Sequence, residues 1–367
     1  MKGKTIIKDI QKAVTYTNKS VGKNTTLPIL SCILVRAKDG FLEFISTNLH
    51  TGVSYKVPAQ IEKEGEVAIP ADLLSQFFTS IGGNQKGDIE FELIENILSF
   101  KSSSTQANIS TQDSIDFPEL PVLDGISFNI KSSVFVESLR GVVFSASNSE
   151  VKPEISSVYI YSKDDVLYFV ATDAFRLAEK TITIKGIPDI DGILIPAKHA
   201  GDIIRIFDNE EGDVEISFTK NQCSISNKNL YVTTRLIDGQ FPDYTQIIPK
   251  EHTTEAVVLV KDFINSLKLS HIFSNNFHEV KLTLSPLNKE FELYVKNSDT
   301  GESSTHLIAT LSGEEIFLMC NIKYLLDVLQ NINSDSVSLS FFGEKKPMLL
   351  RGIGDKKSLY LIMPISR

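Results

Sequence analysis

Ile69-Pro70-Ala71-Asp72 opens a segment that returns later in the chain as Ile195-Pro196-Ala197-Lys198. The next signal returns as well, since Gly87-Asp88-Ile89-Glu90 reappears as Gly212-Asp213-Val214-Glu215. A fainter third copy carries Cys320-Asn321-Ile322-Lys323 in place of the Ile-Pro-Ala signal. The spacing of about 125 residues is far longer than the roughly 20 to 50 residues of a solenoid repeat. The repetition therefore predicts separate domains of one design.

The length of the chain allows three such domains. Its 367 residues give each third a size at which a domain can bury its own core. The segments 119–128 and 244–254 are rich in proline, charge and small polar residues, as short linkers are. We therefore predict a first domain at 1–124, a central domain at 125–249 and a C-terminal domain at 250–367.

The composition is that of a globular protein. Hydrophobic residues make up 42% and charged residues 23%, which argues against disorder and against a fibrous class. The sequence has no run of about 20 apolar residues that could span a membrane, and its N-terminus has no apolar signal core. We therefore expect a cytoplasmic protein without a membrane partner.

Cysteine usage predicts neither disulfides nor a metal centre. Cys32, Cys223 and Cys320 are odd in number, far apart and without a C-x-x-C pair. We expect reduced thiols in or near the core.

Hydrophobic periodicity predicts an α+β fold with two helices in each domain. Apolar residues recur at spacings of three and four in the segments 7–19, 131–144 and 261–274, which predicts one helix in each domain. The Ile-Pro signal and its third copy predict the other helices at 70–81, 196–207 and 321–332, with proline in the first turn of the first two. Alternating or apolar runs such as 41–45 and 166–170 lie between them and indicate strands, mostly antiparallel. Each unit should consist of two helices packed on such sheets.

The distribution of charge matters more than the net charge of −9, which at first argues against a nucleic-acid partner. The predicted helices carry ten basic residues: Lys8, Lys12, Lys19, Lys131, Arg140, Lys198, Arg205, Lys261, Lys268 and Lys323. They carry six acidic ones: Asp9, Asp72, Glu137, Asp202, Asp262 and Asp327. An ordinary solvated helix surface is the simple explanation. Segregation in all three repeats favours a basic helical face, which would attract phosphates without reading bases.

Four motifs then identify a family resemblance. They are 26–30 (Thr-Leu-Pro-Ile-Leu), 171–178 (Ala-Thr-Asp-Ala-Phe-Arg-Leu-Ala), 238–244 (Asp-Gly-Gln-Phe-Pro-Asp-Tyr) and 361–365 (Leu-Ile-Met-Pro-Ile). In order and spacing, over the whole chain, they resemble the bacterial DNA polymerase III beta subunits, the sliding clamps. The resemblance implies a head-to-tail homodimeric ring of six similar domains. Such a ring encircles double-stranded DNA without sequence specificity, tethers the replicative polymerase, and needs neither catalytic residues nor a cofactor or metal.

The resemblance also implies a pocket for short linear peptides of partner proteins. Those partners would be the DNA polymerase III alpha subunit, the clamp loader complex, other polymerases and repair proteins. The matching positions are Ile155, Thr172, Ala174, Phe175, Arg176, Leu177, Pro242, Gln246, Ile247, Leu361, Met363, Pro364 and Ile365. Three of them depart from the family pattern. Ala174-Phe175 replaces the common Gly-His, and Gln246 replaces a common basic residue, so peptide preference should shift toward aromatic ligands.

Two further sets of residues follow from the resemblance and the charge pattern. The DNA-binding candidates are Lys12, Lys19, Lys23, Asn24, Arg140, Asn148, Ser149, Lys152, Lys198, Arg205 and Lys268. The dimer contact should pair a strand edge at 107–110, including Ala107 and Ile109, with an edge of the third domain of the other subunit. Ile272 and Phe273 match hydrophobic interface positions of the family, although both could instead be core residues of the third domain.

Two other classes of function remain as alternatives. An enzyme could use Thr172-Asp173 with Arg176, or the pair Asp164-Asp165, but no G-x-S-x-G, H-E-x-x-H or phosphate-binding loop supports it. A cytoplasmic scaffold that binds peptides without encircling DNA would show no salt-sensitive association with nucleic acid.

Overall fold

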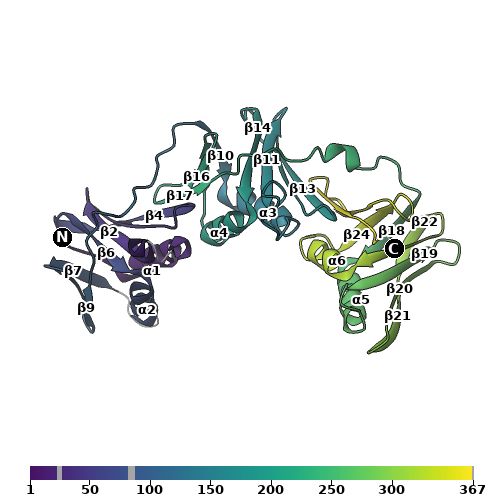
Figure 1. Cartoon of the computed structure of the whole chain (residues 1–367), viewed down its shortest axis with the longest axis horizontal. Coiled ribbons are helices and arrows are strands. Elements are labelled where there is room, and N and C mark those ends of the chain that lie inside the picture. Colours follow the sequence, from purple (N-terminus) through teal and green to yellow (C-terminus); the bar gives the residue numbers. More distant parts are fainter. Residues whose placement is uncertain (23–26, 82–86, 366–367) are drawn as a thin grey trace. The chain divides into compact units, whose positions relative to one another are not determined.

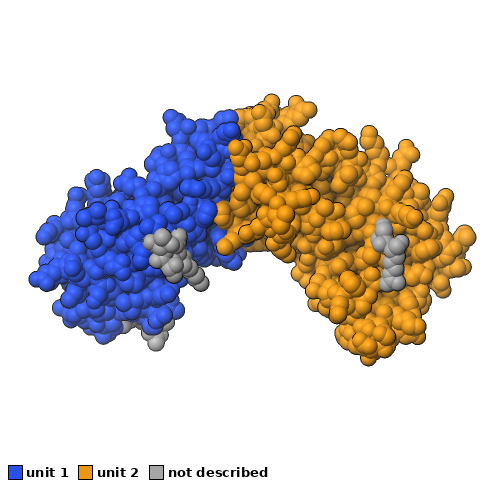
Figure 2. Space-filling view, viewed as in Figure 1, with its two compact units in different colours: residues 1–136, 201–236 blue, residues 137–200, 237–367 orange. Residues whose placement is uncertain are grey.

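The computed structural model describes residues 1–22, 27–81 and 87–365. The chain divides into two compact units, which Figure 2 colours separately. Unit 1 contains residues 1–136 and 201–236, and unit 2 contains residues 137–200 and 237–367. The predicted central domain at 125–249 is shared between them, so the boundaries near 124 and 249 stay a prediction.

The described residues form six α-helices, and each lies where the sequence predicts one. Their bounds are α1 Ile7–Thr17, α2 Ala71–Ile81, α3 Ser132–Val143, α4 Ala197–Phe207, α5 Val260–Ile272 and α6 Ile322–Leu329. Three 3₁₀ turns accompany them, η1 Asn18–Ser20, η2 Pro28–Ser31 and η3 Thr245–Ile247. Only α6 has a side-chain N-cap among those recorded, because Asn321 Oδ1 accepts from the Lys323 and Tyr324 amides at 2.9 and 3.3 Å.

The expectation that Pro70 and Pro196 begin their helices is wrong. Each is the last residue of a strand, and the helix starts at the following alanine. Pro70 is opposite Cys32 and Pro196 is opposite Ser157, on strands that form the outer edge of their sheets. An edge strand tolerates proline, because the missing N–H faces away from the ladder.

Unit 1 contains two antiparallel sheets. The smaller has the order β5-β1-β7-β8-β9 and the larger the order β10-β15-β16-β17-β4-β3-β2-β6. Helices α1 and α2 pack together on one side of these strands (Figure 1). The strand bounds are β1 Lys2–Ile6, β2 Cys32–Lys38, β3 Phe41–Thr47, β4 Thr51–Pro58, β5 Gln60–Lys63, β6 Gly65–Pro70, β7 Asp88–Ile94, β8 Ile97–Lys101, β9 Gln106–Ser110, β10 Ile126–Lys131, β15 Asp213–Phe218, β16 Gln222–Ser226 and β17 Leu230–Arg235.

Unit 2 has the same kind of architecture. A sheet with the order β14-β11-β12-β13-β26-β25-β24-β18-β22 accompanies one with the order β21-β20-β19-β23, and α5 packs against α6 (Figure 1). The strand bounds are β11 Ser157–Lys163, β12 Val166–Thr172, β13 Arg176–Thr183, β14 Ile190–Pro196, β18 Thr254–Leu259, β19 Glu279–Ser285, β20 Glu290–Asn297, β21 Gly301–Leu307, β22 Ala309–Gly313, β23 Ile316–Asn321, β24 Ser336–Phe341, β25 Met348–Gly352 and β26 Ser358–Ile362. Every strand pair recorded in either unit is antiparallel, which confirms the α+β prediction.

The cysteine prediction is also confirmed. Cys32, Cys223 and Cys320 are free thiols with no exposed surface. Burial raises the pKa of Cys223 and of Cys320 to about 12, so both stay protonated and unreactive at neutral pH. Within the described ranges, none of the helices has the length and apolar character needed to cross a membrane.

Candidate functional site

The turn between β12 and β13 is the centre of the predicted peptide pocket. Thr172 Oγ1 donates to the Arg176 carbonyl at 2.6 Å and accepts from the Ala174 amide at 3.1 Å. Asp173 Oδ1 accepts from the amides of Phe175 and Arg176, both at 2.9 Å. Ala174 has φ +74°, the left-handed conformation that places the next side chain outward. These bonds hold Phe175 at the surface, with 62% of it exposed.

Arg176 anchors this turn rather than offering a free charge. Its side chain is only 8% exposed, and its Nε donates to Asp173 Oδ2 at 3.0 Å. Nη1 donates to Asp327 on α6 at 2.5 Å, and Nη2 donates to the Phe144 carbonyl at 2.6 Å. The guanidinium also lies 4.4 Å from the centre of the Tyr324 ring. With its donors used internally, Arg176 positions the turn.

An apolar cluster lies beneath the turn. Leu177 pairs with Leu361 across β13 and β26, and both side chains are buried. Phe241 and Tyr244 pack against the same cluster, which brings Pro242 and the η3 turn over these strands. The Met363 amide donates to the Phe175 carbonyl at 2.8 Å, so the chain terminus continues alongside the turn.

The thirteen predicted pocket residues therefore separate into two groups. The members with exposed surface are Ala174, Phe175, Pro242, Gln246, Ile247 and Met363. The buried or half-buried members are Ile155, Thr172, Arg176, Leu177, Leu361, Pro364 and Ile365. The exposed group offers most of the surface that a docked peptide could touch, and most of that group is apolar. The buried group supports it.

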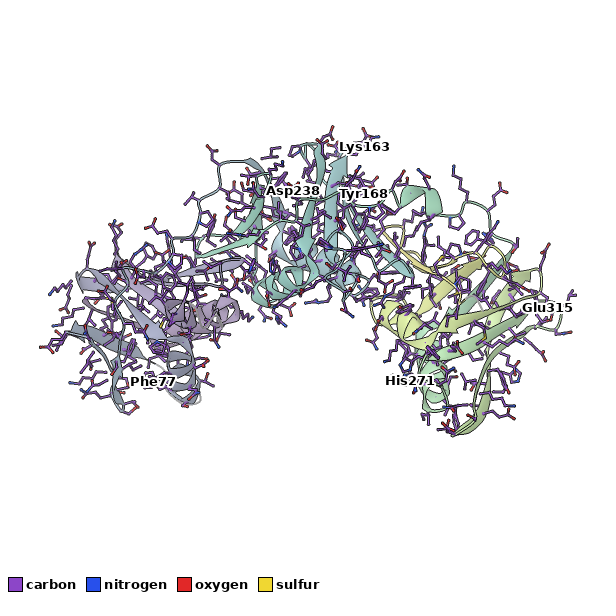
Figure 3. The ribbon with its side chains drawn as sticks, viewed as in Figure 1. Phe77, Lys163, Tyr168, Asp238, His271 and Glu315 are labelled. Atoms are coloured by element: carbon purple, nitrogen blue, oxygen red, sulfur yellow. The ribbon has the colours of Figure 1, made fainter. Side chains whose placement is uncertain are left out.

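Several supporting residues were missed from the sequence. Tyr244 donates to Glu179 Oε2 at 2.5 Å, and its hydroxyl lies 2.8 Å from that of Tyr161. Burial and the charge of Glu179 raise the pKa of Tyr244 well above its usual value, so it remains a neutral donor. Tyr161 stacks on Tyr168, which is labelled in Figure 3, with ring centres 4.4 Å apart. Tyr161 and Tyr168 alternate with buried residues along their strands, which was the available signal.

Two of the basic DNA-binding candidates of unit 1, Lys12 and Lys19, are bound to protein groups. Lys12 Nζ lies 2.6 Å from Glu210, a carboxylate that also accepts from Tyr16 and from Asn227. Lys19 Nζ donates to the Arg205 carbonyl at 2.5 Å. Burial, then the charge of Arg205, lowers the pKa of Lys19. Glu210 thus neutralises Lys12 locally, a pairing that the helix pattern did not predict.

The other DNA-binding candidates are mostly exposed. Those with exposed surface are Arg140, Asn148, Ser149, Lys152, Lys198, Arg205 and Lys268. Lys23 and Asn24 lie outside the described residues. Lys19 and Lys131 also fall outside the observed α-helices, which leaves eight basic and six acidic residues on the six α-helices. The helical excess is therefore +2, smaller than the ten-to-six count of the prediction.

The strand predicted for the dimer contact at 107–110 lies at a sheet edge, and the third domain also offers one. β9 is the last strand of the small sheet of unit 1, and β21 is the last strand of the small sheet of unit 2. Ile109 is only 4% exposed, so its side chain belongs to the core and only its backbone remains on the edge, while Ala107 is half-buried. Ile272 is 66% exposed, which excludes the core alternative for that residue, and Phe273 is half-buried.

Comparison with protein-family models gives matches along the whole chain. The model described as DNA polymerase III beta subunit, N-terminal domain, matches residues 4–121. The models for the central and the C-terminal domain of the same subunit match residues 129–243 and 245–366. The three matches follow one another in the family's order.

Curated relatives and solved structures agree with these matches. The chain is 26% identical to the beta sliding clamp of Synechococcus elongatus, covering 97% of each chain, and 28% identical to that of Rickettsia bellii, covering 98% of this chain and 97% of the relative. The crystal structure of the Thermotoga maritima DNA polymerase III beta subunit superposes with a TM-score of 0.92 at 26% identity. The Bacillus subtilis DNA polymerase sliding clamp gives 0.93 at 25%. Both structural comparisons cover 100% of this chain and 99% of the other.

Proposed function

The chain belongs to the DNA polymerase III beta subunit family and is a non-catalytic DNA sliding clamp of the three-domain clamp fold, and from this premise we propose that it works as a head-to-tail homodimeric ring around duplex DNA. The proposed domains are 1–124, 125–249 and 250–367, acting in the cytoplasm. A closed ring threaded by DNA cannot leave sideways, so a polymerase bound to it stays at a high effective concentration near the primer end.

Two free sheet edges support the proposed dimer. β9 and β21 each end a sheet, and each presents unpaired backbone groups. In a head-to-tail dimer, β9 of one protomer would pair with β21 of the other. The ring would contain two such interfaces, and each would cover one β9 edge and one β21 edge. The exposed side chain of Ile272 would then be buried at the interface.

The exposed apolar surface around Phe175 carries the proposal of partner binding. Phe175, Ile247 and Met363 are 62%, 51% and 37% exposed, and rigid hydrogen bonding holds the turn that presents the first of them. Apolar side chains on a preformed surface suit short linear peptides. We assign as ligands the DNA polymerase III alpha subunit, the clamp loader, other polymerases and repair proteins.

For DNA we propose weak phosphate contacts from the exposed cations of the helices and nearby loops. Arg140, Lys198 and Lys268 are exposed on α3, α4 and α5. Lysine and arginine contacts to phosphates carry no sequence information and weaken with salt, as sliding requires. Lys12 and Lys19 contribute less in this proposal, because protein partners already hold their ammonium groups.

A topological experiment tests the ring. The clamp is loaded by a clamp loader onto a nicked circular plasmid, and the plasmid is then cut once. We expect the protein to stay on the circle in high salt and to leave after linearisation, because only a ring is lost from a free end. Equal loss from circle and linear DNA in high salt would refute encirclement and favour the scaffold alternative. A native mass of a single 40.8-kDa chain at micromolar concentration would refute the dimer.

A paired substitution tests the peptide surface. Phe175→Ala with Met363→Ala should weaken binding of a polymerase tail peptide at least about tenfold, because two exposed anchors are truncated. Leu287→Ala is the matched control, since Leu287 is 96% exposed in the same unit and lies outside the site. Equal affinity of the double variant and the control would remove Phe175 and Met363 from the site. The mass of the assembly should be unchanged in both variants.

A further inference from the structure

Unit 1 contains a second copy of the turn that forms the candidate peptide site. Thr47 Oγ1 donates to the Thr51 carbonyl at 3.0 Å and accepts from the Leu49 amide at 3.0 Å, as Thr172 does in unit 2. Asn48 Oδ1 accepts from the amides of His50 and Thr51 at 2.9 and 2.8 Å, as Asp173 does. Leu49 has φ +72°, against +74° for Ala174. The two turns therefore have the same backbone.

The strand that follows each turn is also paired in the same way. Gly52 is opposite Thr233 across β4 and β17, where unit 2 has Leu177 opposite Leu361. The Arg235 amide donates to the His50 carbonyl at 2.9 Å, which corresponds to the bond from Met363 to Phe175. Each copy is crossed by a linker with a Phe-Pro pair, Phe117-Pro118 in unit 1 and Phe241-Pro242 in unit 2.

The exchanged side chains change the chemistry of the copy. His50 stands in the place of Phe175, Arg235 in the place of Met363, and Thr233 in the place of Leu361. Both His50 and Arg235 have exposed side chains. A cavity of about 270 Å³ lies here, between the turn, Thr233, Arg235 and the linker at 118–121. The turn of unit 1 thus has the same backbone as the turn of unit 2, but it carries polar and cationic side chains where unit 2 has apolar ones.

A second, larger cavity of about 470 Å³ adjoins it along the same linker, since both are lined by Pro118, Glu119 and Leu120. The equivalent sheet face in unit 2 is filled by aromatic rings. Arg36 is opposite Glu43 across β2 and β3, at the position where β11 and β12 place the stacked pair Tyr161 and Tyr168.

The larger cavity therefore has an apolar floor and a polar wall. Leu34, Ile45 and Phe117 form a buried cluster at its base, with Leu120 packed against them. Glu43 and Arg36 form one wall, and Arg36 is already paired with Glu66 at 2.7 Å. In unit 2 the aromatic side chains of Tyr161 and Tyr168 fill this space. Unit 1 has no aromatic side chains at the equivalent positions, so the cavity stays open.

The charge of the lining indicates the ligand. The two cavities are lined by four cations, Arg36, Lys56, Lys228 and Arg235, and by two carboxylates, Glu43 and Glu119. Glu66 already pairs with Arg36, so Lys56, Lys228 and Arg235 carry the remaining positive charge, in a chain whose net charge is −9. Lys56, Lys228 and Arg235 are exposed at the rim, where they can meet an incoming acidic group.

We propose that these adjoining cavities of unit 1 form a second peptide-binding site, selective for an acidic linear peptide with one aromatic or large aliphatic side chain. That side chain fills the cavity above Leu34, Ile45 and Phe117, and a carboxylate binds beside Arg235. The proposal extends the proposed peptide binding of unit 2, whose turn is its template. It gives each protomer two peptide sites of different charge preference.

The test uses the full-length protein and a fluorescein-labelled peptide, Asp-Asp-Tyr-Asp-Leu, with Asn-Asn-Tyr-Asn-Leu as its neutral analogue. We expect fluorescence anisotropy to report binding of the acidic peptide, at least about tenfold tighter than the neutral one at low salt. Arg235→Glu should weaken it at least about tenfold. The control Arg351→Glu reverses an exposed arginine of unit 2 and should leave the affinity unchanged.

A second pair of variants separates this proposal from the proposed function. Phe175→Ala with Met363→Ala disables the site of unit 2 and should not change binding of the acidic peptide. If this double variant abolishes binding while Arg235→Glu does not, the peptide occupies unit 2; the second site is then refuted and the proposed function stands. No binding at 1 mM peptide, or equal affinity for the neutral analogue, also overturns the proposal. Circular dichroism of Arg235→Glu should match that of the parent, because the side chain is exposed.

Discussion

Replacing Arg176 by methionine tests whether the buried guanidinium holds the candidate peptide site together. The substitution keeps an unbranched side chain of similar length but removes the bonds to Asp173, to Asp327 and to the Phe144 carbonyl. Asp173 is 13% exposed and would be left as a nearly buried carboxylate without its cation. Breaking a buried pair on one side typically costs about 3–5 kcal/mol.

The magnitude expected here lies at the lower end of that range. Asp327 is 40% exposed, so water compensates most of its loss and its pair adds less than about 1 kcal/mol. The contact with Tyr324 at 4.4 Å adds about 1 kcal/mol. We therefore expect the free energy of unfolding of unit 2 to fall by about 3 kcal/mol, with the remainder coming from Asp173 and the Phe144 carbonyl.

Urea unfolding measures this effect. With an m-value of about 3 kcal/mol per molar, the midpoint of the transition that reports unit 2 should fall by roughly 1 M. Arg351→Met is the matched control, because Arg351 is exposed on β25 of the same unit, and it should change stability by less than about 0.5 kcal/mol. Equal midpoints for the two variants would show that the bonds of Arg176 do not stabilise the fold, and the reasoning would be refuted.

Three other outcomes are expected. Burial opposes ionisation of Glu210, but hydrogen bonds from Lys12 and Tyr16 outweigh it and lower the pKa of Glu210 below 4.5. Its contribution to stability is therefore fully present above about pH 4.5 and is lost as the pH falls through the lowered pKa. Glu210→Gln should be less stable than the parent at pH 7, and the difference should shrink as the pH falls below about 4.5 in urea titrations. Burial, then nearby positive charge, lowers the pKa of His278, so the free energy of unfolding of the parent should decrease as pH falls below about 6.5. In His278→Asn, a substitution that tolerates the φ of +54°, the free energy of unfolding should depend less on pH. Ile272→Asp should shift the assembly from dimer to monomer at micromolar concentration in light scattering without lowering the unfolding midpoint; an unchanged mass would remove this residue from the proposed interface.

The sequence by itself determined the number, type and order of the helices. Repeats of the Ile-Pro-Ala signal and the apolar periodicity are local patterns, and each predicted helix is present within a few residues of its expected bounds. The errors in this prediction are at the helix ends, as at Pro70 and Pro196. Pairing with a neighbouring strand decides whether such a proline ends a strand or begins a helix. Buried free cysteines also followed from composition and spacing alone.

Only the tertiary structure decided which predicted site residues are accessible. Arg176 is separated by 151 residues from Asp327, so no local pattern could show that its charge is used internally. Glu210 is 194 residues from Tyr16, and it neutralises Lys12 on the same helix. The copy of the turn at Thr47 was equally hidden, because its residue types differ while its hydrogen bonds are the same. Local propensities depend on neighbours in sequence, whereas burial and ion pairing depend on neighbours in space, which the fold alone brings together.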